Sequence, residues 1–159
     1  MLLVFRQLVW ALLRFVLFVN WRYKMRFMLL MIPKGYESAA PGAMPEASAV
    51  EAMMDYNRKL QQAGILMSCE GLHPPSMGAR VSFSAGKALV TDGPFTETKE
   101  VLGGYWMIKV NSKAEAIHWA SLCPAGDNEV IEVRQIQDME DFPEDIQQIA
   151  ADFASMQSS

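Results

Sequence analysis

Residues 27–32 are apolar at odd and even positions alike, in the run Phe27-Met28-Leu29-Leu30-Met31-Ile32. Successive side chains of a strand point to opposite faces, so a strand that is apolar at every position needs a covering layer on both sides. Pro33 and Gly35 end the run. The stretch therefore predicts a strand in the middle of a sheet, and the fold must supply a cover for each face of it.

Two amphipathic helices and five further strands are expected after this strand. The first helix begins at Pro45 and runs to about Gln62, with Gly64 as its C-terminal cap. The second begins with the capping pair Ser112 and Glu115 and ends at Pro124. The expected strands are residues 65–70, 81–83, 88–91, 105–110 and 130–136, and the positions expected to face inward are Val50, Met53, Met54, Asn57 and Leu60 in the first helix and Ala116, Ile117, Ala120 and Cys123 in the second.

The order β, α, β, hairpin, β, α, β predicts an α+β fold of the ferredoxin-like type, with an antiparallel sheet and both helices on one face. In the last strand Ile131 and Val133 alternate with Glu132 and Arg134, so one face is apolar and the other is charged. The first strand is apolar on both faces. We therefore expect a second copy of the chain to cover the face without helices, which makes the protein a homodimer.

The charge distribution divides the chain into an N-terminal extension and a domain. The net charge is −4, but residues 1–24 carry four basic side chains and no acidic one, which leaves −8 for the rest. So acidic a domain is a poor non-specific binder of nucleic acid, and we expect no nucleic-acid partner. We assign residues 1–24 to the extension, 25–142 to the domain, and 143–159 to a C-terminal helix and tail.

The N-terminal extension fits no targeting pattern cleanly. Arg6 and Arg14 interrupt its apolar run, so we do not expect it to span a membrane. A signal peptide is not expected either, because the first five residues are apolar and residues 20–23 are bulky and charged where small residues are needed. An interfacial helix with arginines reaching the headgroups is the alternative. We expect a cytoplasmic protein whose fold starts at Met25.

The cysteines and histidines do not form a metal-binding pattern. Cys69 and Cys123 lack Cys-x-x-Cys spacing, and His73 and His118 lie far apart in the sequence. We expect two reduced, structural thiols, no metal site and no cofactor.

The segment from Thr91 to Glu100 reads TDGPFTETKE and places turn residues and ionisable side chains between two apolar runs. Asp92 and Gly93 form a turn dipeptide, and Pro94 restricts the backbone before it, so the chain leaves the preceding strand sharply. This string resembles the signature of the YCII-related (DGPF) family. The resemblance extends from about Met25 to Phe142 and includes Gly71 to Ser76 (GLHPPS), Cys123-Pro124 and Ile131 to Arg134 (IEVR).

The resemblance implies a dimeric α+β barrel with a pocket, and it implies no established reaction. Family members are often met beside extracytoplasmic-function sigma factors, so a role in signalling also fits the resemblance.

His73 is the leading candidate for chemistry, because imidazole exchanges protons near neutral pH and this one lies on a proline-rich loop. The alternative is an exposed loop histidine without a role. Asp92 could orient His73 or act as a base itself. Equally, it could be a turn residue that bonds its own backbone.

Three further side chains are predicted to bind substrate. Arg134 could hold an anionic group with two hydrogen bonds, or it could pair with Glu132 or Asp92. We expect His73, Asp92 and Arg134 to converge on one cleft. Ser76 and Tyr105 offer hydroxyl groups to the same cleft, and we assign them binding at most. The charged residues Glu97, Lys99 and Glu100 are interpreted as a solvated face.

Two functions are consistent with these residues, and whether the protein is an enzyme stays open. The first is a small homodimer that binds a small anionic organic molecule, with His73 and Asp92 transferring protons in lyase or isomerase chemistry. The second is a non-catalytic ligand-binding or regulatory module. A His73–Asp92 hydrogen bond in a closed apolar cleft would indicate the enzyme, whereas a solvent-exposed His73 would indicate the module.

Overall fold

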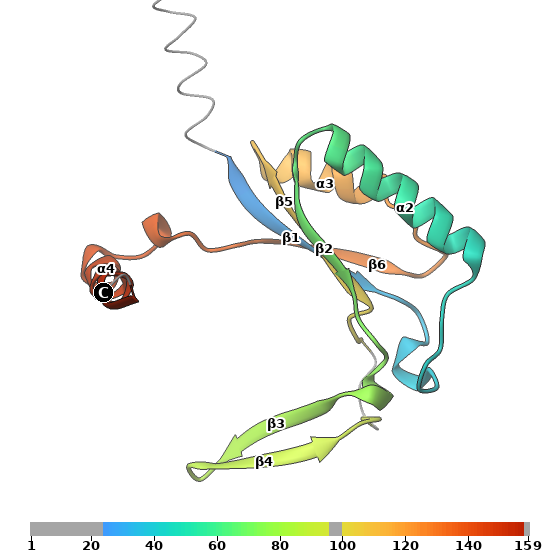
Figure 1. Ribbon diagram of the computed structural model, residues 1–159, viewed down its shortest axis with the longest axis horizontal. Helices are drawn as coiled ribbons and strands as arrows, with labels where there is room; N and C mark the ends of the chain where they lie inside the picture. Colours follow the sequence, from blue (N-terminus) through green and yellow to red (C-terminus); the bar gives the residue numbers. More distant parts are fainter. Residues whose placement is uncertain (1–23, 96–99, 158–159) are drawn as a thin grey trace, which may run out of the picture.

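The computed structural model describes residues 24–95 and 100–157 of the 159-residue chain, with side chains as far as Ala150. A sheet with two helices on one face forms the body, and a separate hairpin and a C-terminal helix extend from it (Figure 1). The elements are β1 (Met25–Ile32), η1 (Tyr36–Ser38), α2 (Ala47–Gln62), β2 (Leu66–Gly71), η2 (Pro75–Met77), β3 (Ala79–Ser84), β4 (Lys87–Asp92), β5 (Gly104–Val110), α3 (Lys113–Ser121), β6 (Val130–Gln135), η3 (Met139–Asp141) and α4 (Glu144–Gln157).

The sheet has the strand order β2-β5-β1-β6, and all three strand pairs are antiparallel. The apolar strand β1 therefore lies inside the sheet, between β5 and β6. This order, with one helix after β1 and another after β5, is the predicted ferredoxin-like α+β fold. The predicted sequence of elements is confirmed, and β3 and β4 form the expected hairpin as a sheet of their own.

Alternation along β1 and β5 places one set of side chains under the helices. Phe27, Leu29 and Ile108 are among the buried residues, and they pack with Tyr56 and Leu60 of α2. The Trp106 indole nitrogen donates a hydrogen bond of 2.7 Å to the Asn57 side-chain oxygen, so the one polar atom of this ring has a partner. Burial of an aliphatic or aromatic side chain of this size contributes roughly 1.5–3 kcal/mol, so this layer holds the helices on the sheet.

The helix faces were predicted only in part. Leu60, Ala116 and Ala120 are buried as expected, but Val50, Met54 and Ile117 are exposed, and for them the prediction was wrong. Tyr56, which was not predicted, is the buried neighbour of Leu60. Each helix packs with a stripe of residues three or four positions apart, so the apolar residues beside that stripe stay in solvent.

The helix ends follow their local signals. Gly64 has a φ of +67°, in the left-handed region just after α2. The Ser112 hydroxyl oxygen accepts a hydrogen bond of 3.1 Å from the Glu115 amide at the start of α3. Both predicted caps are confirmed.

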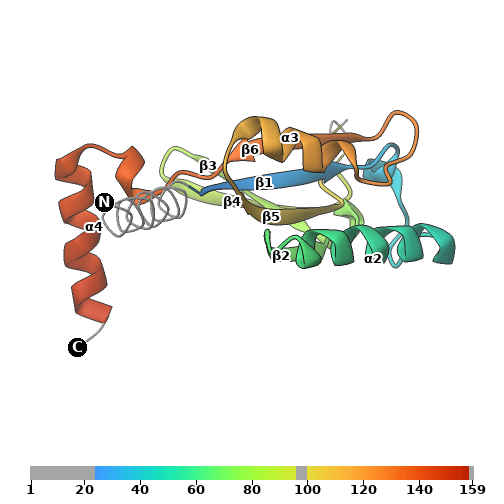
Figure 2. The ribbon, with the colours of Figure 1, turned by 90° about the horizontal axis from the view of Figure 1, so that it is seen from above.

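The opposite face of the sheet is not covered by any helix among the described residues (Figures 1 and 2). Met28 and Leu30 of β1 point to this face, together with Tyr105 and Met107 of β5, because they alternate with the core residues. We call these four residues, with Val130 of β6, the uncovered sheet face. In the last strand, Ile131 and Val133 pack against the core as predicted, while Glu132 and Arg134 are exposed.

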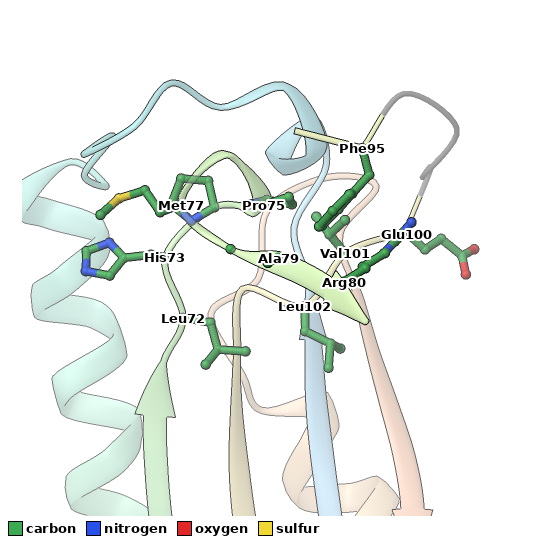
Figure 3. A pocket seen from close by; sticks show the side chains of 12 residues that line it. Leu72, His73, Pro75, Met77, Ala79, Arg80, Phe95, Glu100, Val101 and Leu102 are labelled. Carbon is green, nitrogen blue, oxygen red and sulfur yellow. The ribbon is translucent and has the colours of Figure 1, made fainter. Parts of the chain in front are cut away.

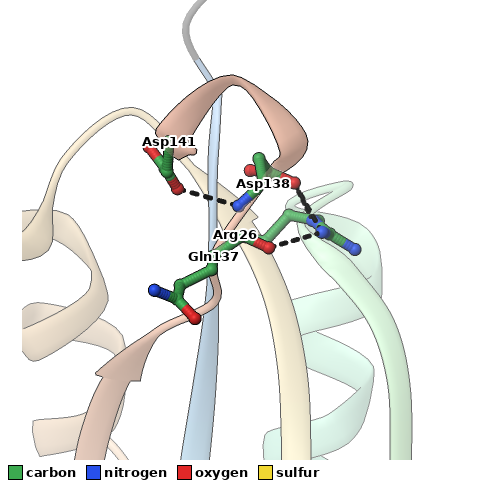
Figure 4. A network of polar contacts seen from close by, with 4 residues as sticks. All are labelled: Arg26, Gln137, Asp138 and Asp141. Atoms are coloured by element: carbon green, nitrogen blue, oxygen red, sulfur yellow. Dashed lines mark hydrogen bonds and ion pairs between the residues drawn. The ribbon is translucent and has the colours of Figure 1, made fainter. Parts of the chain in front are cut away.

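A polar network joins the beginning of β1 to the segment after β6 (Figure 4). The Arg26 guanidinium donates a hydrogen bond of 2.7 Å to the Asp138 carboxylate, and a second nitrogen lies 2.5 Å from the same oxygen. The Asp138 amide in turn donates to the Asp141 carboxylate at 2.8 Å. This network fixes the direction in which the chain leaves the sheet toward α4.

Candidate functional site

An open pocket of about 560 Å³ lies beyond the end of β2, between the loop that follows this strand and the segments that flank β5 and the hairpin (Figure 3). Most of its wall is apolar, and three of its side chains are ionisable. The lining residues are Leu72, His73, Pro74, Pro75, Met77, Gly78, Ala79, Arg80, Phe95, Glu100, Val101 and Leu102.

The loop of residues 72–78 is fastened to the segment after β1. The Tyr36 hydroxyl donates a hydrogen bond of 2.7 Å to the Leu72 carbonyl oxygen, and the Ser76 hydroxyl donates one of 3.0 Å to the Ala39 carbonyl oxygen. Pro74 within this loop is fully buried. These contacts hold the pocket wall although it has little regular structure.

Two glycines, one of them in the TDGPFTETKE segment, permit close contacts between segments near the pocket. A Cβ atom on Gly93 would lie 1.8 Å from the Pro75 carbonyl oxygen, and a Cβ atom on Gly103 would lie 2.4 Å from the Pro33 ring. The Gly93 amide also donates a hydrogen bond of 2.8 Å to the Gly78 carbonyl oxygen. Gly93 therefore locks the end of the hairpin against the loop that carries His73.

Arg80 and Phe95 form one end of the pocket. The guanidinium carbon of Arg80 lies 4.0 Å from the centre of the Phe95 ring, in a cation–π stack. No acidic residue that the structure describes forms an ion pair with Arg80. Stacking holds the flat guanidinium group by its face, so its N–H edges are available to an anion.

His73 lies beside Met77 at the other end of the pocket, as Figure 3 shows. Its side chain is exposed, and it takes part in no hydrogen bond with another described residue. Asp92, the predicted partner, is exposed at the end of β4, where it pairs with Ala79 of the pocket wall. No hydrogen bond joins the His73 and Asp92 side chains in the described part of the chain.

The other predicted binding residues lie elsewhere or have other partners. The Ser76 hydroxyl donates to Ala39, and Tyr105 lies on the uncovered sheet face opposite Leu30. Arg134 is exposed on β6, 3.6 Å from the Glu132 carboxylate. Of the five predicted site residues, His73 is thus the one that lines the pocket, and the single chain does not bring the five together.

Arg80 and Phe95 line the pocket but were not predicted to do so, although Phe95 belongs to the TDGPFTETKE segment. The alternation in β3, where Arg80 precedes the apolar Val81, was a signal that this arginine faces away from the apolar side of the hairpin. Glu100 is exposed, as the interpretation of a solvated face required, but it also lines the pocket. Glu97 and Lys99 lie outside the described residues.

Both thiols are free, as expected, and burial raises the pKa of each. For residues 24–95 and 100–157, no group of three or more His, Cys, Asp or Glu side chains is arranged to hold a metal ion. In the same ranges, no helix is both long enough and apolar enough to cross a membrane.

Comparisons with known proteins identify the domain. The family model described as the YCII-related domain matches residues 25–140. An uncharacterised protein of Rhizobium meliloti (strain 1021) is 40% identical over 77 residues, which is 48% of this chain and 57% of the relative. The chain therefore spans little more than half the length of that curated relative.

Proposed function

Because the chain belongs to the YCII-related family, whose domain fills most of it, we propose that it binds a small anionic organic molecule in the pocket between Arg80 and His73. Of the two candidate functions, we propose first that the protein is a non-catalytic ligand-binding or regulatory module. An exposed His73 is the feature expected of a module, and the pocket is open, whereas a closed cleft is expected of an enzyme. A link to sigma-factor signalling rests on the family resemblance alone.

The observation that carries this proposal is the Arg80–Phe95 stack. A guanidinium group that lies over an aromatic ring and has no acidic partner among the described residues can bind a carboxylate or phosphate group. The apolar wall formed by residues such as Val101 and Leu102 suits the carbon part of an organic ligand. A small organic acid matches both parts of the pocket.

Cofactor-independent proton transfer is the second candidate function. His73 has both ring nitrogens free of described partners, so a ligand in the pocket is the group with which it would exchange a proton. Asp92 would assist from the end of β4. This candidate requires that binding brings the two side chains nearer than they lie in the unliganded chain.

We also propose that the protein is a homodimer in the cytoplasm. The uncovered sheet face supports self-association, because Met28, Tyr105 and Met107 are half-buried apolar or aromatic side chains over which the described part of the chain places no helix. Ser76, Tyr105 and Arg134 keep their predicted role as binding residues within such a dimer.

The binding proposal is tested with a panel of probes: acetate, succinate, benzoate and inorganic phosphate. Backbone amide shifts in an NMR titration should change around residues 72–80 and 100–102 for at least one carboxylate. Arg80→Ala should weaken that binding by about tenfold or more, because a hydrogen-bonded ion pair to a charged group contributes about 1.5–3 kcal/mol.

Arg58→Ala is the matched control, since Arg58 is exposed on α2 and pairs with Asp55 instead of lining the pocket. If Arg80→Ala and Arg58→Ala bind every probe equally well, or if no probe shifts the pocket amides, the proposal is wrong. Phosphate binding without carboxylate binding would assign the site to a phosphorylated ligand.

A further inference from the structure

The β3–β4 hairpin, Ala79–Asp92, has one apolar face that residues 24–95 and 100–157 leave exposed. We call this hairpin the arm. Residues directly opposite in an antiparallel pair point to the same face. Val81 is opposite Val90, and Phe83 is opposite Ala88. The exposed fractions are 54% for Val81, 79% for Phe83 and 68% for Val90. Three large apolar side chains on one face are thus in solvent.

The other face of the arm is mainly polar. It carries Arg80, Ser82 and Ser84 on β3 and Thr91 and Lys87 on β4, with Leu89 as its one large apolar residue. A two-stranded hairpin alone is marginally stable in water, and an amphipathic one gains stability when its apolar face is covered. The division into two faces indicates that this arm has a partner.

The base of the arm is fixed, which holds it away from its own sheet. Gly93 is hydrogen-bonded to Gly78 across the base, and its backbone lies so close to Pro75 that a Cβ atom would not fit between them. Every residue of β3 and β4 is exposed. The arm extends on the side of the sheet opposite α2 and α3, which is the side of the uncovered sheet face (Figures 1 and 2).

We propose that the apolar face of each arm packs on the uncovered sheet face of a second copy of the chain. The inference rests on the proposed homodimer and adds the element that clasps it. In a two-fold dimer each contact occurs twice, so one chain must carry both complementary surfaces. This chain does: Val81, Phe83 and Val90 form one surface, and the half-buried Met28, Tyr105 and Met107 belong to the other.

The arrangement of charge also fits a second copy. Asp92 at the base is the one charged residue on the apolar face of the arm. Lys109, Glu132 and Arg134 are exposed at the margins of the uncovered sheet face, where Arg134 lies 3.6 Å from the Glu132 carboxylate and Lys109 forms no ion pair with a described residue. Apolar surface would meet apolar surface, with opposite charges at the rim, as in ordinary protein interfaces. A second copy covers both surfaces of each chain in one step.

The test places the photo-crosslinker p-benzoylphenylalanine at position 83 in the full chain, with position 82 on the polar face as the matched control. We expect a covalent dimer from position 83, with peptides of β1 or β5 from the other copy attached, and little from position 82. Mixing isotopically light and heavy chains distinguishes links between copies from links within one chain.

The dimer dissociation constant, measured by sedimentation, provides a second readout. Phe83→Asp should raise it by about tenfold or more if the ring is an interface anchor, whereas Ser82→Asp should leave it nearly unchanged. Both side chains are exposed, so circular dichroism should show an intact fold for both.

Links within one chain, links from arm to arm, or equal dissociation constants for the two variants would overturn the role of the arm. If one of these results is obtained and the wild-type chain is still dimeric, the proposed homodimer stands and only the role of the arm is wrong. A monomeric wild-type chain overturns both.

Discussion

Gly93 shows why the signature around residue 92 needs a glycine. Its φ angle is not in the left-handed region, so conformational freedom is not the reason. The reason is space, because the Pro75 carbonyl oxygen occupies the place of a Cβ atom. The glycine joins two motifs that lie far apart in the sequence, the loop with His73 and the turn with Asp92.

We predict that Gly93→Ala lowers the free energy of unfolding by about 1–3 kcal/mol, the usual cost of forcing extra atoms into a packed site. The added methyl group would push the Pro75 loop away and strain the hydrogen bond from Gly93 to Gly78. Urea denaturation followed by tryptophan fluorescence measures the change.

Gly71→Ala is the control, because a Cβ atom there meets nothing within 4 Å. A loss of stability as large in Gly71→Ala as in Gly93→Ala would show that steric contact with Pro75 is not the cause.

At the scale of elements, the sequence was sufficient for the order of strands and helices, since each element has a strong local signal. The two-faced apolar run of β1, the cap at Ser112 and the alternation in β6 all depend on near neighbours in the chain. The helix faces were less predictable. Tyr56 is buried because it meets the Trp106 ring edge to face, with ring centres 5.5 Å apart, and this contact joins distant segments.

The site was less predictable than the fold for the same physical reason. His73 could be identified because a histidine on a proline-rich loop is a local feature. The stack of Arg80 on Phe95 could not, because it depends on how the hairpin is fastened to the next loop. The expected meeting of His73, Asp92 and Arg134 was an inference about tertiary contacts. In the single chain, β6 with Arg134 and β2, which precedes the His73 loop, lie at opposite edges of the sheet.

Cys123, just after α3, gives a prediction for the packing of this helix on the sheet. Burial, followed by the nearby Glu129 carboxylate, raises the pKa of the Cys123 thiol from its ordinary value of 9.0 to about 11. The unfolded thiol ionises first as the pH rises, so its contribution to stability is complete below pH 9 and is lost toward pH 11. The free energy of unfolding should therefore fall across this window.

The measurement is urea denaturation of the wild type and of Cys123→Ala at several pH values from 8 to 11. Other groups also titrate in this range, so the difference between the two proteins is the relevant quantity. The wild type should lose more stability than the variant as the pH rises. Parallel curves for the two proteins would show that the thiol is not buried in the way described.

For the whole molecule, we predict a homodimer at micromolar concentration. Light scattering should give twice the mass of the 17.8 kDa chain. Met107→Glu should shift the protein toward monomer, because it places a charge in the apolar middle of the uncovered sheet face.

Ile117→Glu supplies the comparison, since Ile117 is an exposed apolar residue on α3, on the opposite side of the sheet. The mass of the Ile117→Glu variant in light scattering should equal that of the wild type. Dissociation by both variants alike, or a monomeric wild type, would mean that the uncovered sheet face does not associate.

The strand β3 carries Arg80 on one face and Phe83 on the other, three positions apart in one small unit. In the proposed dimer the opposite face of this strand packs on the second copy, so a ligand that restrains Arg80 also restrains the strand at the interface. Occupancy of the pocket and strength of association are then thermodynamically linked, and the linkage is reciprocal. A ligand that tightens the dimer binds more strongly as the protein becomes more concentrated, so such a domain would report its ligand as a change in assembly.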